Sequence, residues 1–187
     1  MHGGSYLTNQ FLIAMPSLDD PNFTRSVTYV CEHNADGAMG IVINRPLEIF
    51  LDEVLLQMEI EITDRAASRS RVLLGGPVQQ DRGFVLHRLT SHWEATHAIN
   101  DLVGVTTSRD ILDSIAHGRG PAQCLVALGY AGWGTGQLEQ EMAENAWLST
   151  PADLGILFEL PYAQRWEAAA RLVGVDLKTL SLEVGHA

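Results

Sequence analysis

The stretch from Leu128 to Leu148 constrains the fold more than any other part of the sequence, because it combines four glycines, an acidic segment and two tryptophans. The glycines interrupt an apolar run that ends at Tyr130, and they are Gly129, Gly132, Gly134 and Gly136. Glycine adopts positive φ angles without strain and lets another segment approach the backbone closely. We therefore expect a strand that ends in a glycine-rich turn.

The spacing after this turn predicts a short helix. Leu138 and Met142 stand four residues apart on one face, and Thr135 is the candidate N-cap. The acidic positions, which we expect to face water or a partner, are Glu139, Glu141 and Glu144. Trp133 and Trp147 flank the helix, and a buried indole N–H needs an acceptor. The segment is then a helix fixed to the core by tryptophan, or alternatively a ligand-binding loop that uses Trp133 and Gln137.

Hydrophobic periodicity supplies the other elements. Ser26–His33 and Ala38–Asn44 are rich in β-formers, and Asp36-Gly37 between them predicts a hairpin. Further strands are predicted over 10–15, 71–74, 82–89, 102–107 and 121–130, and helices over 51–58, from Thr107 to Gly118, and from Pro161 to Gly174. The strands 102–107 and 121–130 flank a helix, so they are candidates for a parallel pair. The last dozen residues form a short strand or remain unpaired.

These patterns predict an α+β fold with six to eight strands and four helices. Five long segments, in order along the chain, also resemble the AlgH/YqgE family of bacterial proteins: Phe11–Phe23, Cys31–Pro46, Gly75–His87, Thr106–Leu112 and Leu128–Leu148. The resemblance implies a single AlgH/YqgE-like domain over 1–187, with a mixed bifurcated β-sheet folded towards a pseudo-barrel. It also implies a transcriptional regulator, and it supplies no catalytic residues.

Charge argues against contact with nucleic acid. The 187 residues carry a net charge of −11, and Lys178 is the one lysine beside eleven scattered arginines. Proteins that bind DNA gather basic side chains against the phosphates, so direct DNA binding is not expected. The sequence has no export signal and no apolar run of the roughly 20 residues that a membrane span requires, so we expect a cytoplasmic protein without membrane contact.

Two turns and one histidine carry the candidate ligand-binding groups. Arg45 lies between Asn44 and Pro46, where its fork suits an anion, although a surface ion pair is the simpler interpretation. Gly75-Gly76 follows a strand and forms an anion-binding nest or a tight turn. His87 on the next strand is the titratable group with acid–base potential, but its partner is not apparent. The ligand-binding hypothesis comprises Asn44, Arg45, Gly75, Gly76, His87, Trp133 and Gln137.

No catalytic, cofactor or metal motif accompanies these residues. Nucleotide-binding glycine loops and the G-x-S-x-G and S-x-x-K patterns are absent, so no catalytic residue or cofactor is assigned. Cys31 and His33 share a strand face without a second pair at ligand spacing, and Asp19-Asp20 is typical of a solvated turn, so no metal is expected. Cys31 and Cys124 are expected to be buried free thiols.

Three functional hypotheses follow. The leading one is a non-enzymatic cytoplasmic regulatory or binding protein that acts through protein or small-ligand contacts. The second is an enzyme or ligand-binding protein with a cleft near Arg45, Gly75-Gly76 and His87, completed by the loop 132–137. The third, direct regulation of transcription by DNA contact, follows only from the resemblance.

Overall fold

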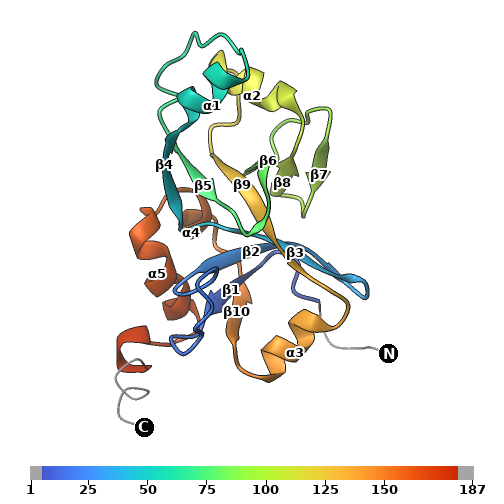
Figure 1. Ribbon diagram of the computed structural model, residues 1–187, viewed down its shortest axis with the longest axis vertical. Helices are drawn as coiled ribbons and strands as arrows, with labels where there is room; N and C mark the ends of the chain where they lie inside the picture. The colour runs from blue at the N-terminus through green and yellow to red at the C-terminus, as the bar shows by residue number, and fades with distance from the viewer. Residues whose placement is uncertain (1–5, 181–187) are drawn as a thin grey trace.

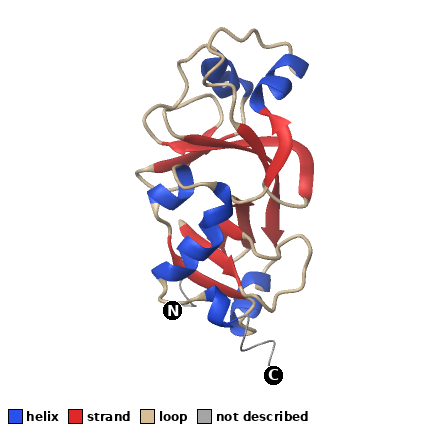
Figure 2. Ribbon diagram, turned by 90° about the vertical axis from the view of Figure 1, so that its left-hand side faces the viewer, coloured by secondary structure: helices blue, strands red, loops and turns tan. Residues whose placement is uncertain are grey.

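The computed structural model describes residues 6–180 and confirms an α+β fold, in which a curled β-sheet carries short helices on its faces and ends (Figures 1 and 2). The strands are β1 (Gln10–Ala14), β2 (Val27–Asn34), β3 (Gly37–Val42), β4 (Pro46–Phe50), β5 (Arg71–Leu74), β6 (Val78–Arg88), β7 (Thr96–Ala98), β8 (Val103–Thr106), β9 (Cys124–Trp133) and β10 (Trp147–Pro151). The helices are α1 (Leu51–Gln57), α2 (Arg109–Ala116), α3 (Gln137–Ala143), α4 (Leu154–Phe158), the 3-10 helix η1 (Tyr162–Gln164) and α5 (Arg165–Leu172).

The sheet divides at β9, as the bifurcated prediction requires. One arm has the order β10-β1-β2-β3-β9, and the other has the order β4-β5-β9-β6-β8-β7. We call them the lower and the upper arm after their places in Figure 1, where β9 crosses from one to the other. The end of β9 pairs with β3 through Ala131–Trp133, and its earlier residues pair with β5 and β6.

Gly129 allows β9 to serve both arms. Its φ of 79° lies in the left-handed region, and it interrupts the regular alternation of side chains along the strand. Leu128 therefore packs towards the helices of the upper arm, whereas Tyr130 packs against the core of Ala127. The close approach expected at these glycines is confirmed for Gly129, since a Cβ there would stand 2.5 Å from the carbonyl oxygen of Gly76. Gly132, Gly134 and Gly136 have no backbone atom that close.

β9 contributes to all three buried clusters of the described residues. The first lies between the sheet and α4 and α5, the second under α1 and α2, and the third beside α3. β9 supplies Leu125 and Ala127 to the first cluster, Val126 to the second, and Ala131 and Trp133 to the third. One strand thus ties together the packing of both arms.

The hairpin prediction is confirmed, since β2 and β3 pair in antiparallel register from Thr28–Val42 to Asn34–Gly37. The strands before and after α2, β8 and β9, run in the same direction, as predicted, but they are not neighbours in the sheet. β8 and β9 both run antiparallel to β6, which lies between them, so they do not pair with each other. Periodicity reports that a strand is buried but not which strand is its neighbour.

Several predicted details were wrong. The described residues contain ten strands, not six to eight, and five complete α-helices, one 3-10 helix and a further helical stretch over 177–180, not four helices. β4, β7 and β10 were not predicted because they are short strands at the ends of the pairing order or beside it. Thr135 is not the N-cap of α3: Gly136 occupies that position with φ 73°, while the Thr135 hydroxyl donates to the carbonyl of Asp36. Residues 177–180 are helical where a strand was one option, and residues 181–187 lie outside the described part.

Candidate functional site

Asn44 and Arg45 hold the loop before β2. The Asn44 side chain accepts a hydrogen bond from the amide of Val27 and donates one to the carbonyl of Arg25, each at 2.9 Å. The Arg45 guanidinium donates to three backbone carbonyls of the same loop, those of Pro21, Asn22 and Thr24. Burial lowers the pKa of Arg45. Its partners are carbonyls rather than the carboxylate of the predicted surface ion pair.

Gly75 and Gly76 allow the chain to pass directly over β9. A Cβ on Gly76 would stand 2.1 Å from the carbonyl carbon of Tyr130, and one on Gly75 would stand 2.4 Å from the carbonyl oxygen of Gly129. The Gly75 amide donates to the carbonyl of Leu128, and its carbonyl accepts from the amide of Val42. Close packing against the β9 backbone therefore requires glycine at both positions.

His87 is fully buried, and both of its ring nitrogens are hydrogen-bonded. Nδ1 lies 2.9 Å from the carbonyl of Arg88, which can only accept, so Nδ1 carries the proton and Nε2 accepts from the Thr106 hydroxyl at 2.7 Å. The Thr106 hydroxyl in turn accepts from Thr96, at 2.8 Å, and Thr96 accepts from the amide of Trp93. Burial is the main cause that lowers the pKa of His87, and the ring is neutral.

This network predicts a pH-dependent stability. A histidine in the unfolded chain titrates near pH 6.5, whereas His87 in the folded protein resists protonation, so the unfolded state binds more protons as the pH falls. The contribution is therefore lost below about pH 6.5 and is constant above it. Between pH 7 and pH 5, the free energy of unfolding of the wild type should fall by up to about 2 kcal/mol more than that of His87→Gln. Urea unfolding of both proteins at both pH values measures this difference. An equal change in the free energy of unfolding between pH 7 and pH 5 for the wild type and His87→Gln would contradict the prediction.

Trp133 and Gln137 meet at Glu141 on α3. One carboxylate oxygen of Glu141 accepts from the indole N–H groups of both Trp133, at 3.0 Å, and Trp147, at 2.9 Å. The other oxygen accepts from the Gln137 amide, whose own oxygen accepts from the Gly134 backbone. Glu141 was expected to face water or a partner, and this expectation was wrong. We call these four side chains, Trp133, Gln137, Glu141 and Trp147, the indole clamp.

The two cysteines are free thiols. Cys31 is buried, whereas Cys124 is partly buried, and burial raises the pKa of both thiols, that of Cys124 to about 11. His33 uses Nε2 to donate to Glu139, at 2.9 Å, and Nδ1 to accept from the amide of Leu7. Neither nitrogen of His33 is therefore open to a metal ion beside Cys31. Within residues 6–180, no group of three or more His, Cys, Asp or Glu side chains is placed to hold one.

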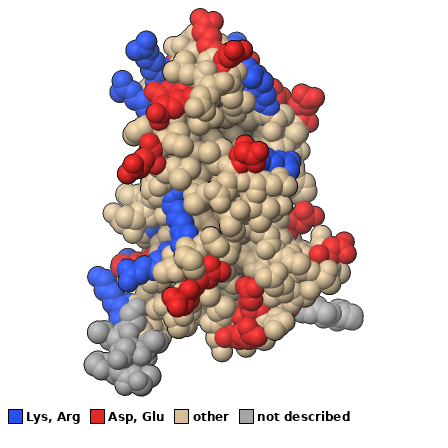
Figure 3. Space-filling model, in the orientation of Figure 1, with Lys and Arg blue, Asp and Glu red and all other residues tan. Residues whose placement is uncertain are grey.

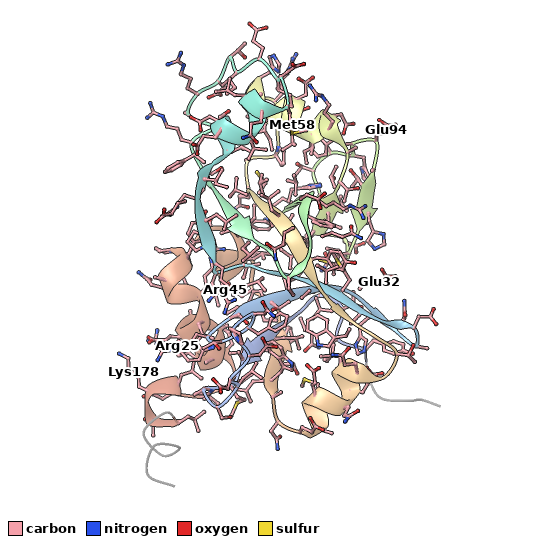
Figure 4. All side chains as sticks on the ribbon, in the orientation of Figure 1. Arg25, Glu32, Arg45, Met58, Glu94 and Lys178 are labelled. Atoms are coloured by element: carbon pink, nitrogen blue, oxygen red, sulfur yellow. The ribbon has the colours of Figure 1, made fainter. Side chains whose placement is uncertain are left out.

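A cavity lies at the junction of the two arms, where the β2–β3 hairpin faces the first half of β6. This junction cleft has a volume of about 710 Å³. Its apolar floor includes Met39, Val78, Phe84 and Tyr130, and its rim consists of Asn34 and the more exposed Glu32, Asp36 and Arg82. Trp133 also lines the cleft, although its ring packs beside α3. The Arg82 guanidinium lies 5.2 Å above the Phe84 ring, and Phe84 meets Tyr130 edge to face. Figure 4 labels Glu32 near the crossing of β3 and β9.

A second cavity, of about 540 Å³, lies between the sheet and the helices of the upper arm. Apolar side chains from α1, α2, β6 and β9 line this helix-side pocket: Val54, Met58, Val85, Leu112, Val126 and Leu128. Its polar lining consists of Gln57, Asp81, Thr106, Thr107, Ser108 and Arg109. Figure 4 places Met58 beside α1, at the end of the molecule remote from Lys178.

The middle of β6 separates these two cavities. Arg82 lines the junction cleft, Asp81, Gly83 and Val85 line the helix-side pocket, and Phe84 borders both. Side chains alternate between the faces of a strand, so this order follows from the sequence once β6 is in place. Of the seven residues in the ligand-binding hypothesis, only Trp133 lines either cavity.

Comparison with known proteins identifies the family to which this fold belongs. The model of a family described as AlgH-like matches residues 11–178. The chain belongs to the AlgH-like family. UPF0301 proteins of this kind include one from Nitrosococcus oceani, 62% identical with 97% of each chain covered, and one from Thioalkalivibrio sulfidiphilus, 60% identical over the whole of both chains.

Two solved structures share the fold. The solution structure of AlgH from Pseudomonas aeruginosa is 48% identical, covers 97% of each chain and has a TM-score of 0.80. A crystal structure from Corynebacterium diphtheriae has a TM-score of 0.73 at 18% identity, covering 97% of this chain and 94% of that one, and it supports the fold alone. Among residues 6–180 of this AlgH-like chain, no helix has the length and apolar composition to cross a membrane.

Sequence reasoning missed most of the residues that line the two cavities. Arg82, Tyr130 and Arg109 lie in segments that resemble the family, but no pattern marked them as binding residues, and their positions depend on pairings between strands distant in sequence. One signal was available: Gly83 interrupts a strand that otherwise carries side chains. A glycine inside a strand commonly marks a bulge or a close approach of another group.

Proposed function

We propose that this AlgH-like chain is a non-enzymatic regulatory protein that binds a protein partner through the junction cleft. The cleft combines an aromatic floor with a charged rim, and this combination is the observation that carries the proposal. Aromatic residues, Met and Arg are enriched at the centres of protein interfaces, and charged groups favour the rim. Phe84 and Tyr130 supply the aromatic surface, while Arg82 has no carboxylate within 4.0 Å among the described residues.

An indirect role in transcription is consistent with the charges. A net charge of −11 repels phosphate, and Figure 3 shows acidic side chains along the length of the visible face. Basic side chains lie both around the upper end of that face and towards its lower left, where Figure 4 labels Arg25, Arg45 and Lys178. The Arg45 guanidinium in that group is already bound to backbone carbonyls. The proposal therefore places the protein in the cytoplasm as a partner of another protein rather than of DNA.

The enzyme hypothesis has less support, because the groups it needs are already occupied. His87 has both nitrogens hydrogen-bonded, Arg45 binds three carbonyls, and Gly75-Gly76 packs against β9. We further propose that the chain works as a single domain, because β9 contributes to every core cluster.

Reversing the charge of Arg82 tests the proposal. Arg82→Glu should weaken binding of a partner isolated with the wild type by about ten- to a hundredfold, since truncated interface arginines cost about 2 kcal/mol or more. Arg65→Glu, the same charge change on an exposed loop outside the cleft, is the matched control and should bind as the wild type does. Affinity is measured by titration calorimetry with the purified partner. Equal binding by Arg82→Glu, or an equal loss in the control, would exclude the cleft.

A further inference from the structure

Gly83 leaves an open space in the helix-side pocket. It pairs with Leu128 inside the 11-residue strand β6, and a Cβ at this position would meet no atom within 4 Å. Its φ does not lie in the left-handed region that favours glycine. Glycine weakens a strand because its backbone loses more conformational entropy on folding and because it provides no side chain to pack. Neither the backbone angle nor a neighbouring atom therefore requires glycine here, and its effect is to keep this wall of the pocket open.

The lining defines the chemistry of an occupant. Apolar side chains reach the pocket from both helices and from the sheet, so its interior favours an apolar body. The charged groups are Asp81, from β6, and Arg109, the first residue of α2. Among the described residues, neither forms an ion pair within 4.0 Å. The volume of about 540 Å³ falls within the range of small-molecule sites.

Arg109 supplies the positive charge at the start of α2, where the Asp110 carboxylate already accepts backbone hydrogen bonds. The N-cap residue Ser108 makes no side-chain capping bond, because its hydroxyl donates to Asp110 and accepts from the amide of Ala95. Arg109 itself is exposed at the pocket, so its guanidinium is available to a carboxylate. Asp81 would accept a hydrogen bond from a hydroxyl or ammonium group on the same molecule, and it opposes a second negative charge.

We propose that the helix-side pocket binds a small amphipathic carboxylate, with the apolar body between α1, α2 and Gly83 and the carboxylate at Arg109. This site is separate from the junction cleft and does not depend on the function proposed for it. A small acid of this class is then a natural ligand of the chain.

Three probes with one alkyl chain and different heads test the charge preference. Octanoate, octanol and octylammonium are titrated into the full chain, and backbone amide shifts are followed by NMR. Octanoate should bind with a dissociation constant at or below about 1 mM, shift the amides of Gly83, Leu112 and Leu128, and bind about tenfold or more tightly than octylammonium. Arg109→Gln should reduce octanoate to the affinity of octanol. Equal or tighter binding of octylammonium, or no shifts at about 10 mM octanoate, overturns the proposal.

Filling the pocket tests its location. Gly83→Val places a β-branched side chain into the open space and suits a strand, so octanoate binding should be lost while the amide spectrum elsewhere is retained. Val54→Phe fills the pocket from α1 and should also abolish octanoate binding. It provides the test in case Gly83→Val disturbs the fold. Leu56→Phe is the matched control, because Leu56 lies on the same helix, is 65% exposed and does not line the pocket. Octanoate binding that survives both filling variants places the ligand elsewhere and overturns the proposal.

Discussion

Glu141→Leu is expected to lower the free energy of unfolding by about 2–4 kcal/mol, because it removes the acceptor for two buried indole N–H groups. Trp133 and Trp147 are only 6% and 3% exposed, so water cannot replace the carboxylate without a change in packing. The loss corresponds to a fall in Tm of roughly 4–16 °C for a chain of this size. Thermal unfolding followed by near-ultraviolet circular dichroism measures both the stability and the order of the tryptophans.

Glu141→Gln is the matched control for this change. Its carbonyl oxygen can still accept from both indoles, but its amide group would face the Gln137 amide, which already donates to the second carboxylate oxygen. Rotation of Gln137 would remove the acceptor of the Gly134 amide, so the conservative variant should lose about 1 kcal/mol. If Glu141→Leu and Glu141→Gln lower the free energy of unfolding equally, the hydrogen bonds to the carboxylate do not hold the tryptophans, and the indole clamp is only a packing contact.

Arg165→Met is expected to be the other strongly destabilising change, at about 2–4 kcal/mol. Arg165 is 2% exposed, donates from Nε to the carbonyl of Leu160 and from a terminal nitrogen to that of Ile43, and lies over the Tyr162 ring. Methionine keeps much of the apolar stem but leaves both carbonyls without this donor. Burial lowers the pKa of Arg165 to about 10, so the side chain is still charged at neutral pH.

A lysine at position 165 separates the hydrogen bonds from the charge. Its ammonium keeps the charge, but it lacks the planar fork that serves two carbonyls at fixed positions, so Arg165→Lys should fall between the wild type and Arg165→Met. Urea unfolding provides the free energies. Because burying an unpaired charge is itself costly, a methionine variant as stable as the wild type would show that desolvation cancels both hydrogen bonds.

The parts of the fold that the sequence predicts are those whose cause is local. The β2–β3 turn occupies Ala35-Asp36, one residue before the predicted Asp36-Gly37, and Gly37 begins β3 with a φ of 140°. Gly129 of β9 has a positive φ and is closely approached by the carbonyl of Gly76. The tryptophans indicated a need for hydrogen-bond acceptors, and Glu141 meets it. Its identity was not predictable, because the acidic residues of one short helix look alike until the helix is docked.

The candidate site was less predictable because its geometry arises from distant pairings. The partner of His87 is Thr106, 19 residues later, and Arg45 binds carbonyls more than 20 residues earlier. Val173, the C-cap of α5, is 36% exposed, whereas the charged Arg165 is buried at the start of that helix. Hydropathy ranks these two residues in the opposite order, because it does not count carbonyls that a guanidinium can satisfy.

One strand, β6, separates the junction cleft from the helix-side pocket, and this arrangement has a thermodynamic consequence. The residues that face the junction cleft and those that face the helix-side pocket alternate along one backbone, so a displacement of that backbone changes both cavities at once. Coupling between two binding sites is reciprocal, whatever its size. If an acid in the pocket alters the affinity of a partner in the cleft by some factor, the partner alters the affinity for the acid by the same factor, and the chain acts as a sensor that reports in either direction.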